Sequence, residues 1–347
     1  MARAGRRLLL GAIGLALAAA VWHTSDLGPA HGAALRDAAL DLDARVALLP
    51  PRSCEPRAAS VRLLGAGSAP RLDAAARFVW FEAPGPDGRA QVFRLERATR
   101  RAECLSCDEP GNNRRPAPHP TARAVVFDTD RWASWRRPFD RELMVLTADE
   151  GARRPARRLT WDAAADTHAL YDPSGLGIAW SRRTLVGRAL RAPIKLGHGS
   201  LSLGRRVVLA RGGLTAATPL AWSPDARAFV WAGGFATARW VERVDFAAST
   251  RDALPAASAF DASVTFSADG ELSLRAERAR GATRVWLEAR GSSAHEVALG
   301  DAAGWGEPTG VALVGDGSAF ALGQRRAAAE RIVWVELACA SGASASE

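Results

Sequence analysis

Four cysteines offer covalent or metal chemistry: Cys54, Cys104, Cys107 and Cys339. Cys104 and Cys107 have the C-x-x-C spacing of a redox pair or of half a zinc site. The sequence holds no second C-x-x-C pair to complete a zinc site, and a redox pair usually opens a helix in a thioredoxin-like fold. We therefore expect Cys104 and Cys107 to form a small disulfide, while redox activity and other pairings stay open.

Few other polar residues have a spacing that predicts catalysis. His119 and His168 precede two of the repeated turns described below, where they could act as ligands or pack between strands. Asp128 and Asp130 could bind calcium, but such a pair more often caps a turn or forms salt bridges with arginine, as neighbouring Arg131 invites. No Asp, Glu and His cluster has metal-site spacing, and the sequence has no G-x-S-x-G motif. We expect no catalytic residue, no metal and no cofactor.

A segment rich in tryptophan and arginine follows Asp130. Tryptophan and arginine are enriched at the energetic hot spots of protein interfaces. We predict partner binding by Trp132, Trp135, Arg136 and Arg137. The alternative is that the tryptophans fold back onto the edge of a sheet.

Internal repeats indicate which elements position these residues. A turn that begins with proline is followed by an apolar run, and an aromatic residue stands seven positions after the proline. The clear copies run from Pro120 to Phe127, from Pro173 to Trp180 and from Pro224 to Trp231. Weaker copies begin at Asp73, Ala268 and Gly315.

The repeat has a simple physical meaning. Proline sets φ for the first corner of a turn, and a run of four or five apolar residues has the length of a short buried strand. A second β-rich run follows each copy, as in 91–95, 142–146, 283–287 and 331–335, so the runs should pair as hairpins. A period of 40 to 50 residues with paired strands is typical of propeller blades. We predict an all-β, six-bladed β-propeller of four-stranded antiparallel blades over residues 58–340.

The repeats resemble those of the TolB-type propeller family, which carry a Ser-Pro-Asp-Gly turn before an apolar strand. Ser223, Pro224 and Asp225 match that turn, and Ala226 replaces the glycine. The resemblance covers all six repeats and implies a propeller, but it says little of function. Similar blades occur in prolyl oligopeptidase-like peptidases and in pectate-degrading lyases. TolB has an α/β domain before its propeller, for which residues 26–57 leave no room, so its partners are not carried over.

The N-terminal residues predict export. Arg3, Arg6 and Arg7 precede an apolar run over 8–22, which is short for a transmembrane helix. We assign 1–25 as a signal peptide or N-terminal anchor and 26–57 as a linker with a short helix over 33–49. Residues 341–347 are predicted to be a disordered tail.

The ends of the predicted propeller carry the two remaining cysteines. Cys54 precedes the first blade, and Cys339 follows the last strand. Because a closed propeller brings its two ends into one blade, we predict a Cys54–Cys339 disulfide. An even cysteine count in an exported chain permits both bridges.

The charge does not favour nucleic acid as a partner. The net charge of +9 falls to +6 if cleavage removes the three N-terminal arginines, and the other arginines are scattered without a nucleic-acid-binding motif. We therefore predict an exported, non-enzymatic propeller that acts as a protein-interaction scaffold, periplasmic or extracellular, with an envelope protein or peptide as partner. An uncleaved 8–22 segment would be its only membrane contact, as an inner-membrane anchor. The alternatives are a carbohydrate-active lyase or hydrolase and a small-ligand-binding propeller that uses the central channel.

Overall fold

The computed structural model divides into two units, Met1–Leu48 and Leu49–Glu347. It describes residues 56–121, 124–133, 140–147, 155–161, 164–183, 187–197, 200–203, 207–211, 218–222, 228–235, 238–245, 250–254, 263–267, 272–279, 282–289 and 293–339. The predicted signal segment, the helix over 33–49, Cys54 and the tail over 341–347 lie outside these residues. Within them, no helix is long and apolar enough to cross a membrane.

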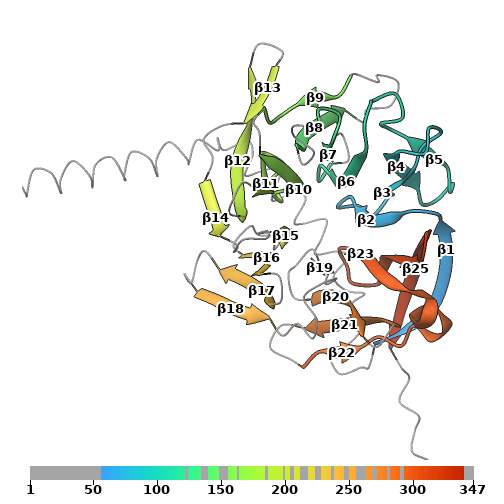
Figure 1. The fold of residues 1–347 in the computed structure, drawn as a ribbon. Coiled ribbons are helices and arrows are strands. Elements are labelled where there is room, and N and C mark those ends of the chain that lie inside the picture. Colours follow the sequence, from blue (N-terminus) through green and yellow to red (C-terminus); the bar gives the residue numbers. More distant parts are fainter. Residues whose placement is uncertain are drawn as a thin grey trace, which may run out of the picture. The chain divides into compact units, whose positions relative to one another are not determined.

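The described elements are almost all β-strands, and they form antiparallel sheets in chain order (Figure 1). The first sheet contains β2 (Ser68–Leu72), β3 (Phe78–Pro84), β4 (Ala90–Glu96) and β5 (Ala102–Cys104). The second contains β6 (Asn113–Pro118), β7 (Ala124–Thr129), β8 (Glu142–Thr147) and β9 (Arg157–Arg158). The third contains β10 (Ala165–Tyr171), β11 (Gly177–Arg183), β12 (Gly187–Gly197) and β13 (Ser200–Leu203), and β14 (Val207–Arg211) also pairs with β12.

Three further sheets complete the described part of the chain. The fourth contains β15 (Thr218–Trp222), β16 (Ala228–Phe235), β17 (Ala238–Asp245) and β18 (Thr250–Leu254). The fifth contains β19 (Ser263–Phe266), β20 (Leu272–Ala279), β21 (Ala282–Ala289) and β22 (His295–Glu296), followed by a 3-10 helix, η2 (Gly300–Trp305). The last contains β23 (Glu307–Leu313), β24 (Ala319–Arg326), β25 (Ala329–Cys339) and β1 (Pro56–Gly65).

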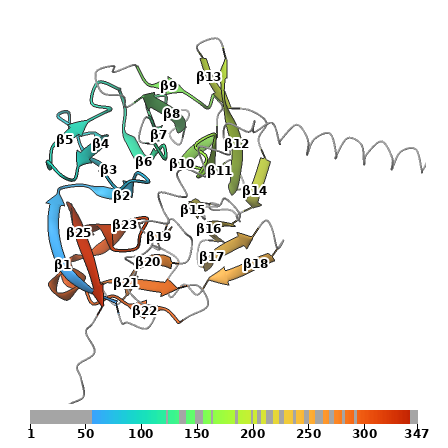
Figure 2. The ribbon, with the colours of Figure 1, turned by 180° about the vertical axis from the view of Figure 1, so that it is seen from behind.

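The last sheet joins the two ends of the described chain. β1 runs antiparallel to β25, with Pro56 opposite Cys339 and Val61 opposite Val335. The first strands of the sheets contact one another in the order β2, β6, β10, β15, β19 and β23, and β23 contacts β2 (Figures 1 and 2). This closed order of antiparallel sheets confirms the predicted all-β propeller fold. The Cys54–Cys339 bridge stays a prediction, because Cys54 is outside the described residues.

The repeated turns lie where the sequence places them, between the first and second strands of a sheet. The copies at 73, 120, 173 and 315 follow β2, β6, β10 and β23, while those at 224 and 268 fall outside the described residues. In two of the turns, an aspartate carboxylate accepts a hydrogen bond from a backbone N–H at the end of the turn. The Asp73 carboxylate accepts a hydrogen bond from Phe78 N at 2.7 Å, and the Asp172 carboxylate accepts one from Gly177 N at 3.3 Å. Such side-chain bonds hold the reversal that starts the second strand.

The second strands carry the largest buried side chains. The aromatics that the repeat predicted are at most 2% exposed: Trp80, Phe127, Trp180 and Trp231. The apolar clusters join neighbouring sheets; Trp180, for example, packs with Val126 and Leu143 of the second sheet and with Leu190 of its own sheet. Each sheet therefore buries its face by stacking on the next, as in other repeat folds.

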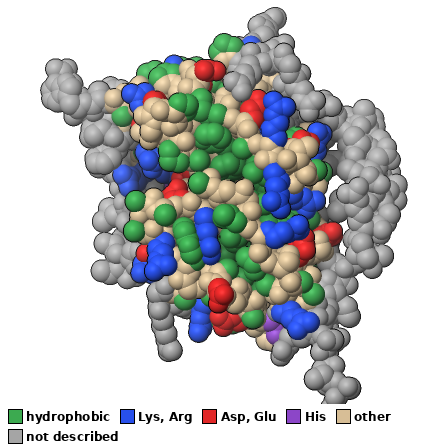
Figure 3. Space-filling view, turned by 90° about the vertical axis from the view of Figure 1, so that its right-hand side faces the viewer, with side chains coloured by type: hydrophobic (Ala, Val, Ile, Leu, Met, Phe, Trp, Pro, Cys, Tyr) green, Lys and Arg blue, Asp and Glu red, His purple; other side chains and the backbone are tan. Residues whose placement is uncertain are grey.

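Strand β1 is the outer edge of its sheet. Figure 3 shows the side of the molecule that carries β1, with hydrophobic side chains across the middle of the face and arginine side chains around them. Val61 is 39% exposed and Leu63 is 61% exposed on this strand.

Candidate functional site

The first strands are irregular at the same place in several sheets. Register shifts interrupt β2, β6, β10, β15 and β23 near their middle. Four of these strands hold a proline there, and proline within a sheet is confined to edges, strand starts and bulges. Ala69, Arg115 and His168 stand in three of the bulges with positive φ of 50°, 52° and 53°. A bulge re-aims the side chains around it, so these positions set up a site on adjacent inner strands.

The centre of this site is the carboxylate of Asp128 on β7, whose side chain is fully buried. Arg115 Nη1 lies 3.0 Å from Asp128 Oδ2, and Arg141 Nη1 donates to Oδ1 at 2.9 Å. Charge-assisted hydrogen bonds of this kind are stronger than neutral ones. One buried acid thus holds two arginines, one from β6 and one from the segment before β8.

Arg115 is fixed through its backbone as well. Its N–H donates to Glu82 Oε2 at 3.0 Å, and Glu82 Oε1 accepts from Ser68 Oγ at 3.1 Å. Glu82 belongs to β3 of the first sheet, so its carboxylate joins the first sheet to the bulge of the second.

His168 lies in the bulge of β10, with Nδ1 2.9 Å from Thr167 Oγ1. Burial, and then the positive charges of Arg115, Arg71 and Arg141, lower the pKa of His168 well below its ordinary value. The imidazole is therefore neutral at pH 7, and its surroundings are electropositive.

Arg71 follows the bulge of β2, and β2 contacts β6. Burial lowers the pKa of its guanidinium to about 10, so it stays charged at neutral pH. Among the residues that the structure describes, it has no hydrogen-bond or ion-pair partner. We call Arg71, Arg115, Arg141, His168 and Asp128 the arginine cluster.

The arginine cluster suits the binding of anions better than that of cations. Guanidinium groups are donors only and match the geometry of carboxylate and phosphate. In the described part of the chain, no group of three or more His, Cys, Asp and Glu side chains could hold a metal ion.

The arginine cluster was not predicted from the sequence, in which Asp128 and His168 were two unconnected candidates. His168 precedes its turn as expected, and the structure adds that it lies in a bulge of β10. The signal that could have found the site is proline inside apparent strands, at Pro70 and Pro116, because such prolines mark bulges.

The salt bridges predicted for Asp128 and Asp130 form, but with other arginines. Arg131 pairs instead with Glu109, at 3.0 Å. Asp130 accepts hydrogen bonds from Asn112 N at 2.7 Å and Asn112 Nδ2 at 2.8 Å. The predicted partner was wrong because Asp130 and Arg131 lie in the turn after β7, where Arg131 reaches Glu109 and Asp130 accepts from Asn112 instead.

His119 makes packing contacts. Its ring meets Tyr171 edge-on at 4.9 Å between centroids, and its Nδ1 lies 2.9 Å from Thr121 Oγ1. The contact with Tyr171 joins the turn of the second sheet to β10 of the third.

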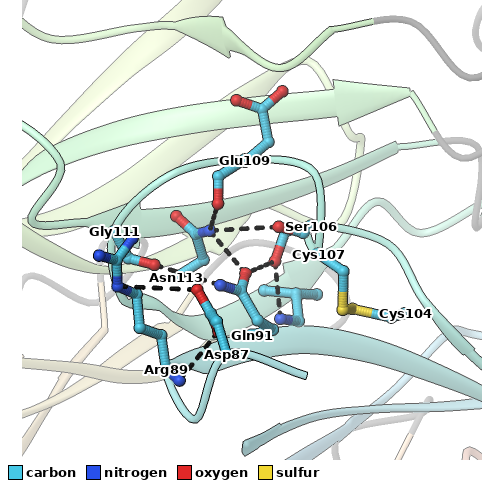
Figure 4. The surroundings of a disulfide bond; sticks show 10 residues. Asp87, Arg89, Gln91, Cys104, Ser106, Cys107, Glu109, Gly111 and Asn113 are labelled. Carbon is cyan, nitrogen blue, oxygen red and sulfur yellow. Dashed lines mark hydrogen bonds and ion pairs between the residues drawn. A yellow bond between two sulfur atoms is a disulfide. The ribbon is translucent and has the colours of Figure 1, made fainter. Parts of the chain in front are cut away.

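Cys104 and Cys107 form the expected disulfide at the end of β5 (Figure 4). Ser106 between them is fully buried; its hydroxyl donates to Gln91 Oε1 at 2.7 Å and accepts from Val92 N at 2.9 Å. Asn113 Nδ2 donates to the same Gln91 oxygen at 2.7 Å. The bridge thus closes a loop whose polar groups tie the first sheet to the start of the second.

Trp132 of the predicted partner-binding segment lies partly buried against the apolar cluster of the first two sheets. The Arg131 guanidinium carbon lies 4.9 Å from its ring centroid, and that of Arg158 lies 3.9 Å away. Arg158 also faces Trp161 at 5.9 Å, and Trp161 is 62% exposed. We call these four residues the Trp161 surface. Trp135, Arg136 and Arg137 lie outside the described residues.

Comparisons with known proteins support the fold alone. No protein-family model matches the chain, and no curated protein matches it. A solved structure of a putative TolB from Agrobacterium tumefaciens is 12% identical, with a TM-score of 0.51 over 69% of this chain and 82% of that one. TolB from Acinetobacter baumannii is 16% identical, with a TM-score of 0.49 over 77% of this chain.

The chain spans about half of the Acinetobacter TolB, 53% of whose length it covers. An oligogalacturonate lyase from Vibrio parahaemolyticus is 12% identical, with a TM-score of 0.46 over 78% of each chain. The order of the sheets, together with the likeness to the Agrobacterium structure, makes the fold that of a TolB-like β-propeller.

Proposed function

We propose that this chain is an exported, non-enzymatic β-propeller that acts as a protein-interaction scaffold in the cell envelope, in the periplasm or outside the cell. The Trp161 surface carries the proposal. Trp161 provides the exposed contact area, and the Arg158 guanidinium, which faces both Trp161 and Trp132, orders its ring before a partner binds. The outermost ring is largely exposed.

We extend the proposal to residues that follow Trp132 in the sequence and lie outside the described residues. Trp135, Arg136 and Arg137 add the same residue types, and we propose that they bind the same envelope protein or peptide. The Cys104–Cys107 disulfide supports export, because disulfides persist in oxidising compartments. The basic and apolar N-terminal sequence supports it as well.

Trp161→Ala is expected to weaken partner binding at least tenfold, since truncation of a hot-spot tryptophan costs about 2 kcal/mol. The partner is first captured from solubilised envelopes of the source cell with the wild-type chain, and its Kd is then measured with purified components. The melting temperature should not change, because the side chain is mostly in water.

The matched control is Leu176→Ala, which removes a side chain that is 42% exposed at the turn between β10 and β11. It should bind as the wild type does. The proposal fails if Trp161→Ala and the double variant Trp135→Ala, Arg136→Ala both retain the wild-type Kd.

A carbohydrate-active enzyme, a lyase or a hydrolase, is the alternative, and the arginine cluster is the feature that favours an anionic saccharide. Turnover of polygalacturonate by the wild type, abolished in Arg115→Gln, would replace the scaffold proposal with this one.

A further inference from the structure

The inner strands assemble a second site that the scaffold proposal does not use. Arg71, Arg115 and His168 come from three consecutive sheets, and each lies in or directly after a bulge of the first strand. β2 contacts β6 and β6 contacts β10, and the charges of Arg115 and Arg71 act on His168. The same local irregularity therefore brings three basic groups together.

The arginines of this site differ in whether a carboxylate neutralises their charge. Asp128 accepts hydrogen bonds from Arg115 and Arg141. The Glu82 oxygens are engaged by Ser68 Oγ and Arg115 N. The Arg71 guanidinium has neither a hydrogen bond nor an ion pair with any residue that the structure describes. A partly desolvated guanidinium that finds no counter-ion among the described residues is unfavourable, since buried charges in proteins are normally paired.

His168 supplies a neutral donor to the same region. When the Thr167 hydroxyl donates to Nδ1, the ring proton is on Nε2, which can then donate to a ligand. Positive φ at His168 and Arg115 costs free energy that the fold must supply, and such strain is concentrated at binding and catalytic positions.

We propose that Arg71, Arg115 and His168 bind a carboxylate group of a ligand, with Arg71 as its principal counter-ion. The planar guanidinium fork matches the two oxygens of a carboxylate, and a neutral imidazole adds a hydrogen bond without further positive charge. A free di- or tricarboxylate and an acidic peptide both present this group. The site is distinct from the Trp161 surface in its residues and in its chemistry.

The test compares citrate, a Glu-rich peptide, inorganic phosphate and chloride at matched ionic strength. Binding to the purified chain is measured by calorimetry, and melting temperature by differential scanning. The wild type should be stabilised by citrate, the peptide or both, and not by chloride. A response to the peptide alone identifies a protein source of the carboxylate, and a response to citrate identifies a free acid.

Arg71→Gln should weaken carboxylate binding at least tenfold while its melting temperature without ligand equals or exceeds that of the wild type. Both results are expected together because the substitution removes a desolvated charge and, with it, the proposed contact to the ligand. The control is Arg62→Gln, an arginine on β1 with a side chain that is 51% exposed, which should leave binding unchanged. Arg71→Lys, which keeps the charge but loses the fork, should bind with intermediate affinity and serves if the Gln variant does not fold.

The proposal is overturned if carboxylates act no differently from chloride, or if phosphate binds and carboxylates do not. It is also overturned if Arg71→Gln melts below the wild type and still binds carboxylate with the same affinity.

Discussion

Asp128→Ala should lower the free energy of unfolding by about 3 kcal/mol. The carboxylate is the shared acceptor of Arg115 and Arg141, whose side chains are only 28% and 23% exposed. Its removal leaves two like charges close together in a site that water enters only in part. Breaking a buried pair is much costlier than deleting a surface pair, because the remaining charge is uncompensated. Equilibrium unfolding in urea measures the change.

The matched control for Asp128→Ala is Glu296→Ala. Glu296 pairs with Arg284 at 3.4 Å, and the two side chains are 43% and 41% exposed. Its loss should cost less than about 1 kcal/mol, as for other surface ion pairs. Adding Arg115→Met to Asp128→Ala should recover part of the lost stability by removing one orphaned charge. An Asp128→Ala cost no larger than that of Glu296→Ala would contradict this account of the cluster.

Trp180→Ala should cost about 4 kcal/mol, the range for a large aromatic removed from a packed core. Trp180 is fully buried between the second and third sheets, where it packs with Val126 and Leu143. Its Nε1 donates to Asp166 Oδ1 at 3.0 Å, so truncation creates a cavity and also removes a donor from a buried carboxylate. Urea denaturation monitored by circular dichroism measures the loss without depending on the fluorescence of the deleted ring.

Two variants separate the causes of the Trp180 effect. Trp180→Phe keeps most of the apolar volume and loses the N–H, so it should cost less than the alanine substitution. Trp161→Ala removes the same side chain from a position that is 62% exposed and should change stability by less than about 1 kcal/mol. Equal costs for Trp180→Ala and Trp161→Ala would mean that the interface between the second and third sheets does not depend on Trp180.

Local patterns predicted much of the fold. Turns that begin at 120 and 173 were placed correctly because proline and its neighbours fix the corner from within a few residues. The aromatics seven positions later are buried, as at Phe127 and Trp180, because a strand that starts at a fixed turn points its side chains to alternate faces. The Cys104–Cys107 bridge was also predictable, since its two cysteines are three positions apart.

The partners across strands could not be predicted in this way. Arg131, beside Asp130 in sequence, pairs with Glu109, and Asp128 is held by Arg115 and Arg141. Which arginine reaches an acid depends on register and on bulges, and one shifted residue turns a side chain to the other face. No motif of fixed spacing records such a choice.

The sequence by itself therefore determined the repeated turn-and-strand unit, the residues buried on its second strand and the short disulfide, because each depends on chemistry within a few residues. The sequence also predicted that the two ends share one blade, but only the tertiary structure decided the register in which β1 pairs with β25. It alone also decided that Arg71 and His168, about 100 residues apart, share one electropositive site. The physical reason is that stacking of neighbouring sheets brings separate bulges together, and the resulting burial and electrostatics belong to the assembled ring rather than to any one repeat.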